Sequence, residues 1–419
     1  MKKRRTRTVS RSAPFSLLVK PAGPDCNLRC TYCFYLKKAA VFADRETHRM
    51  STDVLERLIS SYMSTKQPVY SFGWQGGEPS LMGVEFFRQV TRFQQEYGRP
   101  GVQVANGLQT NATLITDELA EHLGEYRFLV GASIDGPADL HDVHRRTRGG
   151  ETTHATVMES VQRLRKHRVE VNALTLVSKA NVGDPRRVYE FLRDHDLNYM
   201  QFIPCVEFTP NGELAPFAIT GREWGEFLLE IFDLWYDDDV RTVSIRHHDA
   251  LMSFLLEGSR HMCTMGGSCD AYFVVEHNGE VYPCDFYVEP ELKLGNVLTD
   301  SWESMGGRPK RVQFAKQKSD WHEACDGCAH LPYCSGDCIK HRDAAPQGRG
   351  SWLCEGWQMY YDRTVPVFRD LARQVAADRG FYGPLWEPNA YDPEQPCYCG
   401  SGRKAKNCHL AEVNHSTTA

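Results

Sequence analysis

The chain has 419 residues, of which 41% are hydrophobic and 25% are charged, as in a globular protein of two or three domains. The net charge of −5 gives no basis for nucleic-acid binding, and no apolar run approaches the roughly 18 residues that cross a bilayer. The basic residues 1–14 precede an apolar stretch that is too short for a signal peptide. We therefore expect a flexible tail on a cytoplasmic protein, with no nucleic-acid or membrane partner.

Residues 15–225 alternate short apolar segments with longer amphipathic ones. The short segments read as strands and are Phe15–Val19, Val69–Gly73, Val102–Gln109, Phe128–Ile134, Val171–Val177 and Tyr199–Pro204. The longer segments have helical spacing and are Thr52–Thr65, Val84–Tyr97, Asp117–Gly124, Thr153–His167 and Pro185–His195. This alternation predicts the α/β class, with a partial (β/α)6 barrel of the TIM-like kind and functional residues at the carboxyl ends of its strands.

The rest of the chain divides by composition. Residues 226–260 predict a connecting helical segment, and the apolar helix Trp224–Trp235 leads into it. Residues 261–378 are rich in cysteine, with one hairpin (Tyr272–Glu276 and Val281–Pro283) and a helix at Trp357–Ala377. A Pro- and Gly-bearing linker, 379–395, precedes a small terminal module, 396–419.

Fourteen of the 15 cysteines are concentrated in three groups, which in a reducing compartment indicates metal ligands. Cys26, Cys30 and Cys33 share one loop after the first strand. Three thiolates leave one iron of a cubane open for the amino and carboxylate groups of S-adenosylmethionine (SAM). On spacing alone, a zinc loop with a distant fourth ligand is the alternative. The Cys-x3-Cys-x2-Cys loop, with Tyr32 before its last cysteine, resembles the signature of the radical SAM superfamily.

The segment Gly76-Gly77-Glu78-Pro79 follows the second predicted strand, where the superfamily binds the amino group of SAM. Gly76 and Gly77 would let the backbone approach the ligand, and Glu78 would accept from its ammonium.

The resemblance also implies that Ser133 and Arg145 hold SAM, with Asn111 and Asp135 ordering the loops nearby. Two further arginines follow within three residues of Arg145. Either of them could serve the same carboxylate, or the whole basic cluster could be a solvated face.

Eight cysteines follow the barrel, enough for two cubanes or for two structural zinc sites. The spacing Cys325-x2-Cys328-x5-Cys334-x3-Cys338, followed by Cys354, resembles the SPASM domain of peptide-modifying radical SAM enzymes. In that pattern one auxiliary [4Fe–4S] cluster is held by Cys263, Cys269, Cys284 and Cys338. The other is held by Cys325, Cys328, Cys334 and Cys354. Closed clusters of this kind carry electrons or stabilise the fold, and the resemblance implies three [4Fe–4S] clusters in all.

The segments Val281–Tyr287, Phe232–Tyr236 and Val243–Arg246 resemble the anaerobic sulfatase-maturating enzymes, and the resemblance spans roughly residues 13–375. Those enzymes oxidise a cysteine or serine in a sulfatase Cys/Ser-x-Pro-x-Arg segment to Cα-formylglycine. The resemblance implies an unfolded or nascent sulfatase as substrate, a low-potential donor such as flavodoxin or ferredoxin, and a monomeric enzyme. The sequence does not choose between cysteine and serine as the target.

Three residues receive roles in this resemblance. Asp285 would be the catalytic base, although an aspartate at a strand end also caps turns. Tyr35 and Gln75 match positions that contact the substrate peptide, although a tyrosine near a cluster loop is often only packing.

The terminal module carries Cys397, Cys399, Cys408 and His409 and resembles the SEC-C zinc motif. Three thiolates and one imidazole suit tetrahedral zinc, and so short a segment needs metal to fold. The module would dock a partner or tie down the tail. Most sulfatase-maturating enzymes lack it.

Two other functions compete with sulfatase maturation. A different SPASM peptide maturase would form thioether or carbon–carbon crosslinks in a precursor peptide. A zinc-rich scaffold with a degenerate barrel would have no activity at all. Cys205 fits none of the cysteine sets, and we expect it to be a small buried apolar residue.

Overall fold

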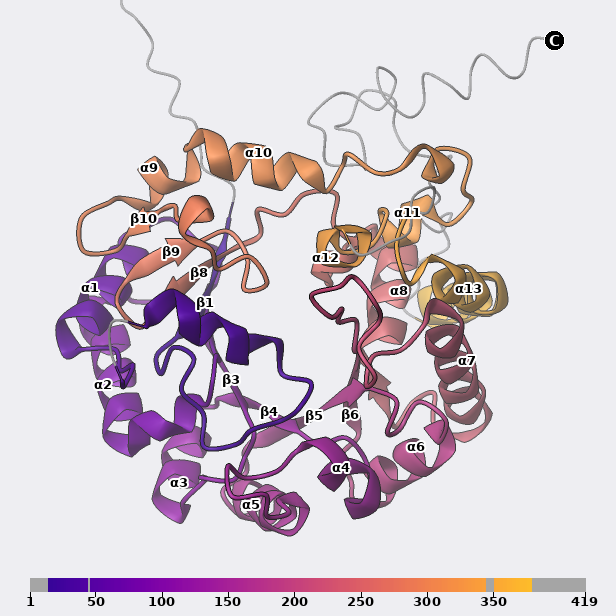
Figure 1. The fold of residues 1–419 in the computed structure, drawn as a ribbon, viewed down its shortest axis with the longest axis horizontal. Helices are drawn as coiled ribbons and strands as arrows, with labels where there is room; N and C mark the ends of the chain where they lie inside the picture. The colour runs from indigo at the N-terminus through magenta and orange to yellow at the C-terminus, as the bar shows by residue number, and fades with distance from the viewer. Residues whose placement is uncertain (1–13, 44–45, 344–349, 379–419) are drawn as a thin grey trace, which may run out of the picture.

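One sheet of ten strands organises this computed structural model, which describes residues 14–43, 46–343 and 350–378 (Figure 1). The strand order is β10-β9-β8-β1-β2-β3-β4-β5-β6-β7, and all neighbours from β8 through β1 to β7 pair in parallel. The six predicted strands are present as β1 (Ser16–Lys20), β2 (Tyr70–Trp74), β3 (Val104–Thr110), β4 (Leu129–Ser133), β5 (Glu170–Val177) and β6 (Tyr199–Pro204).

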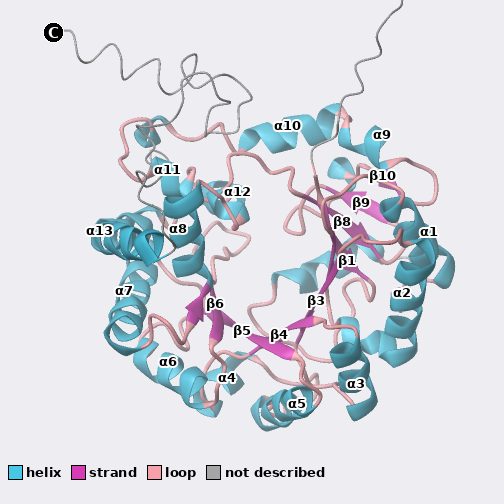
Figure 2. Cartoon of the chain, turned by 180° about the vertical axis from the view of Figure 1, so that it is seen from behind, coloured by secondary structure: helices cyan, strands magenta, loops and turns pink. Residues whose placement is uncertain are grey.

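The predicted helices surround the curved sheet, as Figure 2 shows. They are α1 (Thr52–Met63), α2 (Gly83–Tyr97), α3 (Asp117–Glu125), α5 (His154–Lys166) and α6 (Pro185–Asp194). Within residues 15–260, α4 (Ala138–His144) was not predicted, and α8 (Arg246–Glu257) was expected only as part of the connecting helical segment 226–260. The first is too short to show a helical period. The first turn of the second contains two histidines that are buried in the structure. Because histidine is polar, the sequence does not show that this turn belongs to the buried face of the helix.

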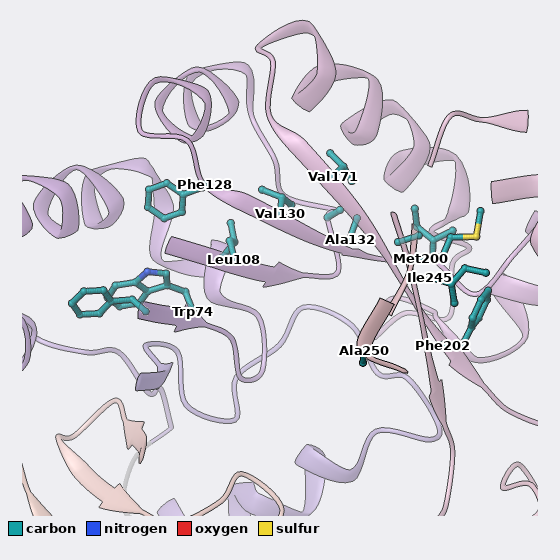
Figure 3. Close-up of a cluster of buried hydrophobic side chains, with 14 of the residues drawn as sticks. Trp74, Leu108, Phe128, Val130, Ala132, Val171, Met200, Phe202, Ile245 and Ala250 are labelled. Atoms are coloured by element: carbon teal, nitrogen blue, oxygen red, sulfur yellow. The ribbon is translucent and has the colours of Figure 1, made fainter. Parts of the chain in front are cut away.

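Apolar side chains fill the space between the sheet and the helices. Figure 3 shows part of this core, in which Trp74, Leu108, Phe128 and Val130 are buried. Two of these five helices begin at a side-chain cap: Ser51 accepts from the backbone N–H of Val54 at the start of α1, and Thr116 accepts from that of Leu119 at the start of α3. This rigid frame leaves the carboxyl ends of the strands as the place for a site.

The cysteine-rich region continues the barrel sheet instead of standing apart from it. The predicted hairpin is β8 (Tyr272–Glu276) and β9 (Glu280–Tyr282), and β10 (Gly295–Asn296) follows. β8 pairs in parallel with β1, in a register that runs from Ser16 opposite Tyr272 to Lys20 opposite Glu276. Because of this pairing, the segment after β9 lies near the end of β1.

The remaining elements close the ring. They are β7 (Ser244–Ile245), α7 (Gly221–Asp238), α9 (Trp302–Gly306), α10 (Pro309–Gln317), α11 (Leu331–Cys334), α12 (Ile339–Asp343) and α13 (Cys354–Asp378). Short 3-10 helices are η1 (Phe34–Phe42), η2 (Pro79–Met82), η3 (Cys263–Met265), η4 (Pro290–Leu292) and η5 (Glu323–Cys325). No helix within the described ranges is long and apolar enough to cross a membrane. The predicted zinc ligands Cys397, Cys399, Cys408 and His409 lie outside the described residues.

Candidate active site

The cysteine loop between β1 and η1 lies directly against the Gly76–Glu78 segment. The backbone N–H of Gly77 donates to Gly23 O at 2.8 Å, and that of Glu78 donates to Asp25 O at 2.7 Å. A Cβ on Gly77 would lie 1.9 Å from the Asp25 carbonyl oxygen, so only glycine fits there. The close approach explains the glycine requirement and joins the two predicted SAM-site segments into one unit.

We expect Gly77→Ala to weaken SAM binding at least tenfold, because the added methyl group must push Asp25 and the adjoining cysteine loop aside. Equilibrium dialysis of SAM against the anaerobically reconstituted protein measures this. The matched control is Gly107→Ala in β3, where the nearest atom to a new Cβ is 3.9 Å away. Unchanged affinity in Gly77→Ala would contradict the close packing of these two segments.

Glu78 turns its carboxylate into the protein. Its Oε1 accepts from the Ser80 N–H at 2.9 Å and from the hydroxyls of Ser80 and Thr110 at 2.7 Å each. Its Oε2 accepts from the Asn111 N–H at 2.7 Å. Burial raises the pKa of Glu78, and these hydrogen bonds oppose that rise. Glu78 therefore links the ends of β2 and β3. Because Oε1 already accepts three hydrogen bonds, the predicted bond to the ammonium of SAM would be made by Oε2.

The first cysteine of the loop is held by hydrogen bonds to its sulfur. Cys26 Sγ receives the N–H of Leu28 at 3.4 Å and the Asn111 side-chain amide at 3.6 Å. Burial raises the pKa of the Cys26 thiol to about 12 and that of Cys30 to about 11, and the neighbouring cysteines add to both rises. Thiols that are shielded from water and close together lose their protons most readily when they bind a positively charged metal centre. These residues therefore fit an iron–sulfur cluster.

Arg145 is the buried member of its basic cluster, whereas the two arginines that follow it are exposed. Its Nε donates to Asp135 Oδ2 at 2.9 Å, and the Tyr32 hydroxyl donates to the same oxygen. The N–H of Leu176 donates to Asp135 Oδ1 at 3.0 Å. Burial lowers the pKa of Arg145, but its interactions with Asp135, Tyr32 and Cys30 together outweigh this and raise the pKa. Ser133, half-buried, ends β4 two residues before this ion pair.

The predicted base and the two predicted substrate contacts lie close together around Lys20. Nothing in the sequence singles out this lysine. Gln75 Nε2 donates to Asp285 Oδ2 at 3.4 Å, and Lys20 Nζ lies 3.7 Å from the same oxygen. The ammonium also lies 4.6 Å from the centre of the Tyr35 ring, and Lys20 is only 2% exposed. The Tyr35 hydroxyl donates to Glu276, which is fully buried. No local sequence signal marks Lys20 or Glu276, because they meet only through the register of β1 and β8.

Cys284 contacts the polar groups around Lys20 and so connects them to the other cysteines of residues 263–354. Its thiol donates to Asp285 Oδ1 at 3.7 Å, and the Tyr272 hydroxyl lies 3.5 Å from its sulfur. The carboxylate of Asp285 is therefore next to a predicted cluster ligand on one side and Lys20 on the other.

The other cysteines fall into two neighbourhoods. Burial is the main cause that raises the pKa values of Cys263, Cys269, Cys284, Cys325, Cys334 and Cys338, and charge interactions between neighbouring thiols show which cysteines lie close together. The pairs in the first neighbourhood are Cys263 with Cys269, Cys263 with Cys338, and Cys284 with Cys338. The pairs in the second are Cys325 with Cys328 and Cys328 with Cys334, and Cys354 begins α13. Within residues 14–43, 46–343 and 350–378, no three Cys, His, Asp or Glu side chains converge as they would on a single metal ion.

An open groove with a volume of about 480 Å³ lies between η1, the segment after β6, the residues that follow Asp285, and α12. Its aromatic lining includes Phe34 and Phe286, whose ring centres are 4.8 Å apart. Lys340 Nζ lies 4.5 Å from the centre of the Phe286 ring and pairs with Glu207. Because Phe286 directly follows Asp285, the groove begins beside the predicted base.

Comparisons with known proteins agree with this geometry. Residues 21–192 match the radical SAM superfamily, residues 263–329 match the SPASM iron–sulfur cluster-binding domain, and residues 395–411 match the SEC-C motif. The cysteine-type anaerobic sulfatase-maturating enzyme of Clostridium perfringens (strain 13 / Type A) is 33% identical over 368 residues, which cover 86% of this chain and 99% of the relative. The chain belongs to the family of anaerobic sulfatase-maturating enzymes.

The family also includes a serine-type relative, from Bacteroides thetaiotaomicron, that is 35% identical over 382 residues, or 86% of this chain and 92% of the relative. A solved structure described as native anSMEcpe with bound AdoMet and Cp18Cys peptide matches with a TM-score of 0.79 at 33% identity. The match covers 87% of this chain and all of that one. The predicted radical SAM fold, enzyme class and use of iron–sulfur clusters and SAM are confirmed for this sulfatase-maturating family member, and the zinc-rich scaffold is wrong.

Proposed function

We propose that this chain oxidises a cysteine or serine of a sulfatase Cys/Ser-x-Pro-x-Arg segment to Cα-formylglycine. The observation that carries the proposal is the meeting of Asp285, Gln75 and Tyr35 around Lys20, beside the predicted cluster ligand Cys284. Family membership supports it, since the relatives are named as maturases of both target types. Crosslink formation, the other candidate, finds no comparable support among the relatives.

The cofactor assignments follow the donor sets. Cys26, Cys30 and Cys33 would hold the cluster that binds SAM, and the SAM contacts would be Gly76, Gly77, Glu78, Ser133 and Arg145. The two cysteine neighbourhoods would each hold one auxiliary cluster, with Cys354 as the fourth ligand beside Cys325, Cys328 and Cys334. Zinc in the SEC-C module, a low-potential electron donor and a monomeric state complete the proposal. When bound, the first cluster and SAM supply abstraction of a hydrogen atom from the target Cβ.

Asp285 would take the proton that the oxidation releases from the target thiol or hydroxyl. The oxidation removes two electrons and two protons from the side chain; one electron and one proton leave together as the Cβ hydrogen. The remaining proton would pass to Asp285 and the remaining electron to an auxiliary cluster. A serine target would give formylglycine directly, whereas a cysteine target would give a thioaldehyde that water hydrolyses to formylglycine with release of hydrogen sulfide. Gln75 and Lys20 both contact Asp285 Oδ2, so they hold the carboxylate in place and leave Oδ1 toward Cys284.

The aromatic groove would hold the substrate beyond its reactive residue. The faces of Phe34 and Phe286 suit the substrate proline, because aromatic rings bind apolar rings well. The carboxylates of Glu207 and Asp343 also line the groove and suit the substrate arginine. The groove thus offers one complement for each conserved side chain of the Cys/Ser-x-Pro-x-Arg segment.

We expect anaerobic turnover with SAM and a reductant to convert a Cys-x-Pro-x-Arg or Ser-x-Pro-x-Arg peptide to its formylglycine form. Mass spectrometry of matched peptides measures the conversion, and the relative rates identify the preferred target. A peptide in which alanine replaces the target residue is the control. Formation of 5′-deoxyadenosine with neither peptide changed would show that the substrate is a different peptide.

A further inference from the structure

A single buried ammonium lies among the loops that carry the auxiliary cysteines. Lys318, directly after α10, is 0% exposed. Its Nζ donates to Thr264 O at 2.9 Å, to Ser335 O at 3.1 Å and to Asp337 O. Burial lowers the pKa of Lys318, but these three carbonyls accept all three N–H groups of the charged form. Lys318 has no direct part in the proposed oxidation of the target residue.

The three carbonyl groups belong to cysteine-bearing loops. Thr264 follows Cys263, and Ser335 and Asp337 lie between Cys334 and Cys338. Ser335, Gly336 and Asp337 have φ values of 46°, 70° and 63°, so this loop is in the left-handed region throughout. Such a conformation is costly for the two non-glycine residues and persists only where the surroundings enforce it. Here the carbonyl groups it presents are bound by cations.

Arg342 reinforces the same loop from its other side. Its guanidinium donates to Gly336 O at 2.5 Å, to Ser335 O at 2.8 Å and to Asp337 O at 3.1 Å. Because Cys334 and Cys338 belong to different predicted cluster sets, this cation-bound loop is the shortest stretch of chain that joins the two sets.

The charge of Lys318 reaches both cysteine sets. In five of these thiols, burial raises the pKa and the nearby Lys318 ammonium opposes the rise. The five are Cys263, Cys269 and Cys338 of the first set and Cys325 and Cys334 of the second. A buried positive charge stabilises any added negative charge nearby, and the effect is strong where water is excluded.

We propose that Lys318 is a positioning residue that raises the reduction potentials of both auxiliary clusters and so makes them better electron acceptors. The inference rests on the cluster assignments of the proposed function. It does not depend on the identity of the substrate, because each cluster gains one negative charge on reduction whatever the donor. Hydrogen bonds and charge around cluster ligands are established determinants of such potentials.

The test compares Lys318→Gln and Lys318→Met with Lys316→Met. Lys316 is exposed in the last turn of α10, two residues before Lys318. Lys316→Met therefore removes one positive charge from the surface and leaves the buried charge in place. All three are made in a full-length background with Cys26, Cys30 and Cys33 changed to alanine, so that only auxiliary clusters remain. Iron content and redox titrations followed by electron paramagnetic resonance are measured after reconstitution.

We expect both Lys318 variants to keep their iron while both midpoint potentials become more negative, by the equivalent of at least a tenfold change in the one-electron equilibrium, about 59 mV. We expect Lys316→Met to leave the potentials unchanged. Potentials in the Lys318 variants equal to those of the control would overturn the proposal. Loss of iron from both Lys318 variants would also overturn it, because Lys318 would then act by holding the loops and not by its charge. Failure of the peptide assay with the potentials shifted as expected would leave this inference standing.

Discussion

Asp285→Asn is expected to lower formylglycine formation by a factor of about 10² to 10⁴, the range for loss of a positioned general base. Asparagine keeps the size of the side chain and its contact with Gln75, but it cannot accept the target proton. Iron content and formation of 5′-deoxyadenosine are expected to stay at wild-type levels. Mass spectrometry of the peptide and chromatography of the nucleoside product measure the two activities separately in one reaction.

The variant also leaves the buried ammonium of Lys20 without its carboxylate, so a change in stability must be separated from a change in chemistry. The double variant Lys20→Met, Asp285→Asn removes both charges. We expect it to unfold at the wild-type temperature and still to lack formylglycine formation. Recovery of peptide oxidation in the double variant would show that Asp285 balances a charge and does not act as the base.

Asp135→Ala is expected to lower the free energy of unfolding by about 3–5 kcal/mol, the cost of leaving one partner of a buried ion pair unpaired. Asp135 is 2% exposed and Arg145 is 9% exposed, and the same carboxylate also accepts from Tyr32 and from the backbone of Leu176. Urea unfolding of the anaerobically reconstituted protein, followed by circular dichroism, measures the loss.

The matched control is Asp139→Ala, which removes a carboxylate that pairs with Arg187 on the exposed surface of α4. We expect no measurable loss of stability there, because solvent and salt screen such pairs. We also expect Asp135→Ala to weaken SAM binding, since Arg145 loses the partner that orients its guanidinium toward the site. Equal stability of the two variants would show that the pair between Asp135 and Arg145 is not buried in solution.

The arrangement around Lys20 links the two halves of the enzyme physically. β1 belongs to the radical SAM barrel and β8 to the cysteine-rich region, and their pairing puts Lys20 of one opposite Glu276 of the other. Tyr35 contacts both residues, through its ring to Lys20 and through its hydroxyl to Glu276. The proposed site of proton removal would therefore lie across the junction between the radical SAM barrel and the cysteine-rich region.

Local features of the chain were predictable from sequence. The six strands and the five predicted helices of residues 15–204 lie within three residues of their predicted bounds, because apolar periodicity reflects which face of each element is buried. The loop with Cys26, Cys30 and Cys33 and the segment with Gly77 were found for a similar reason. Ligands that share one short loop are close in space whatever the fold around them.

The sequence by itself determined the order of the barrel strands and the family, and it predicted the cysteine sets, since each depends on spacing within short segments. Only the tertiary structure decided that Lys20 and Glu276 join Asp285, and that Lys318 lies among the auxiliary cysteines. These residues meet through the pairing of strands some 250 positions apart and through loops closed over a buried charge. A single lysine in a sequence carries no sign of whether it will be solvated on the surface or enclosed by three carbonyl groups, because that difference arises only when distant segments pack together.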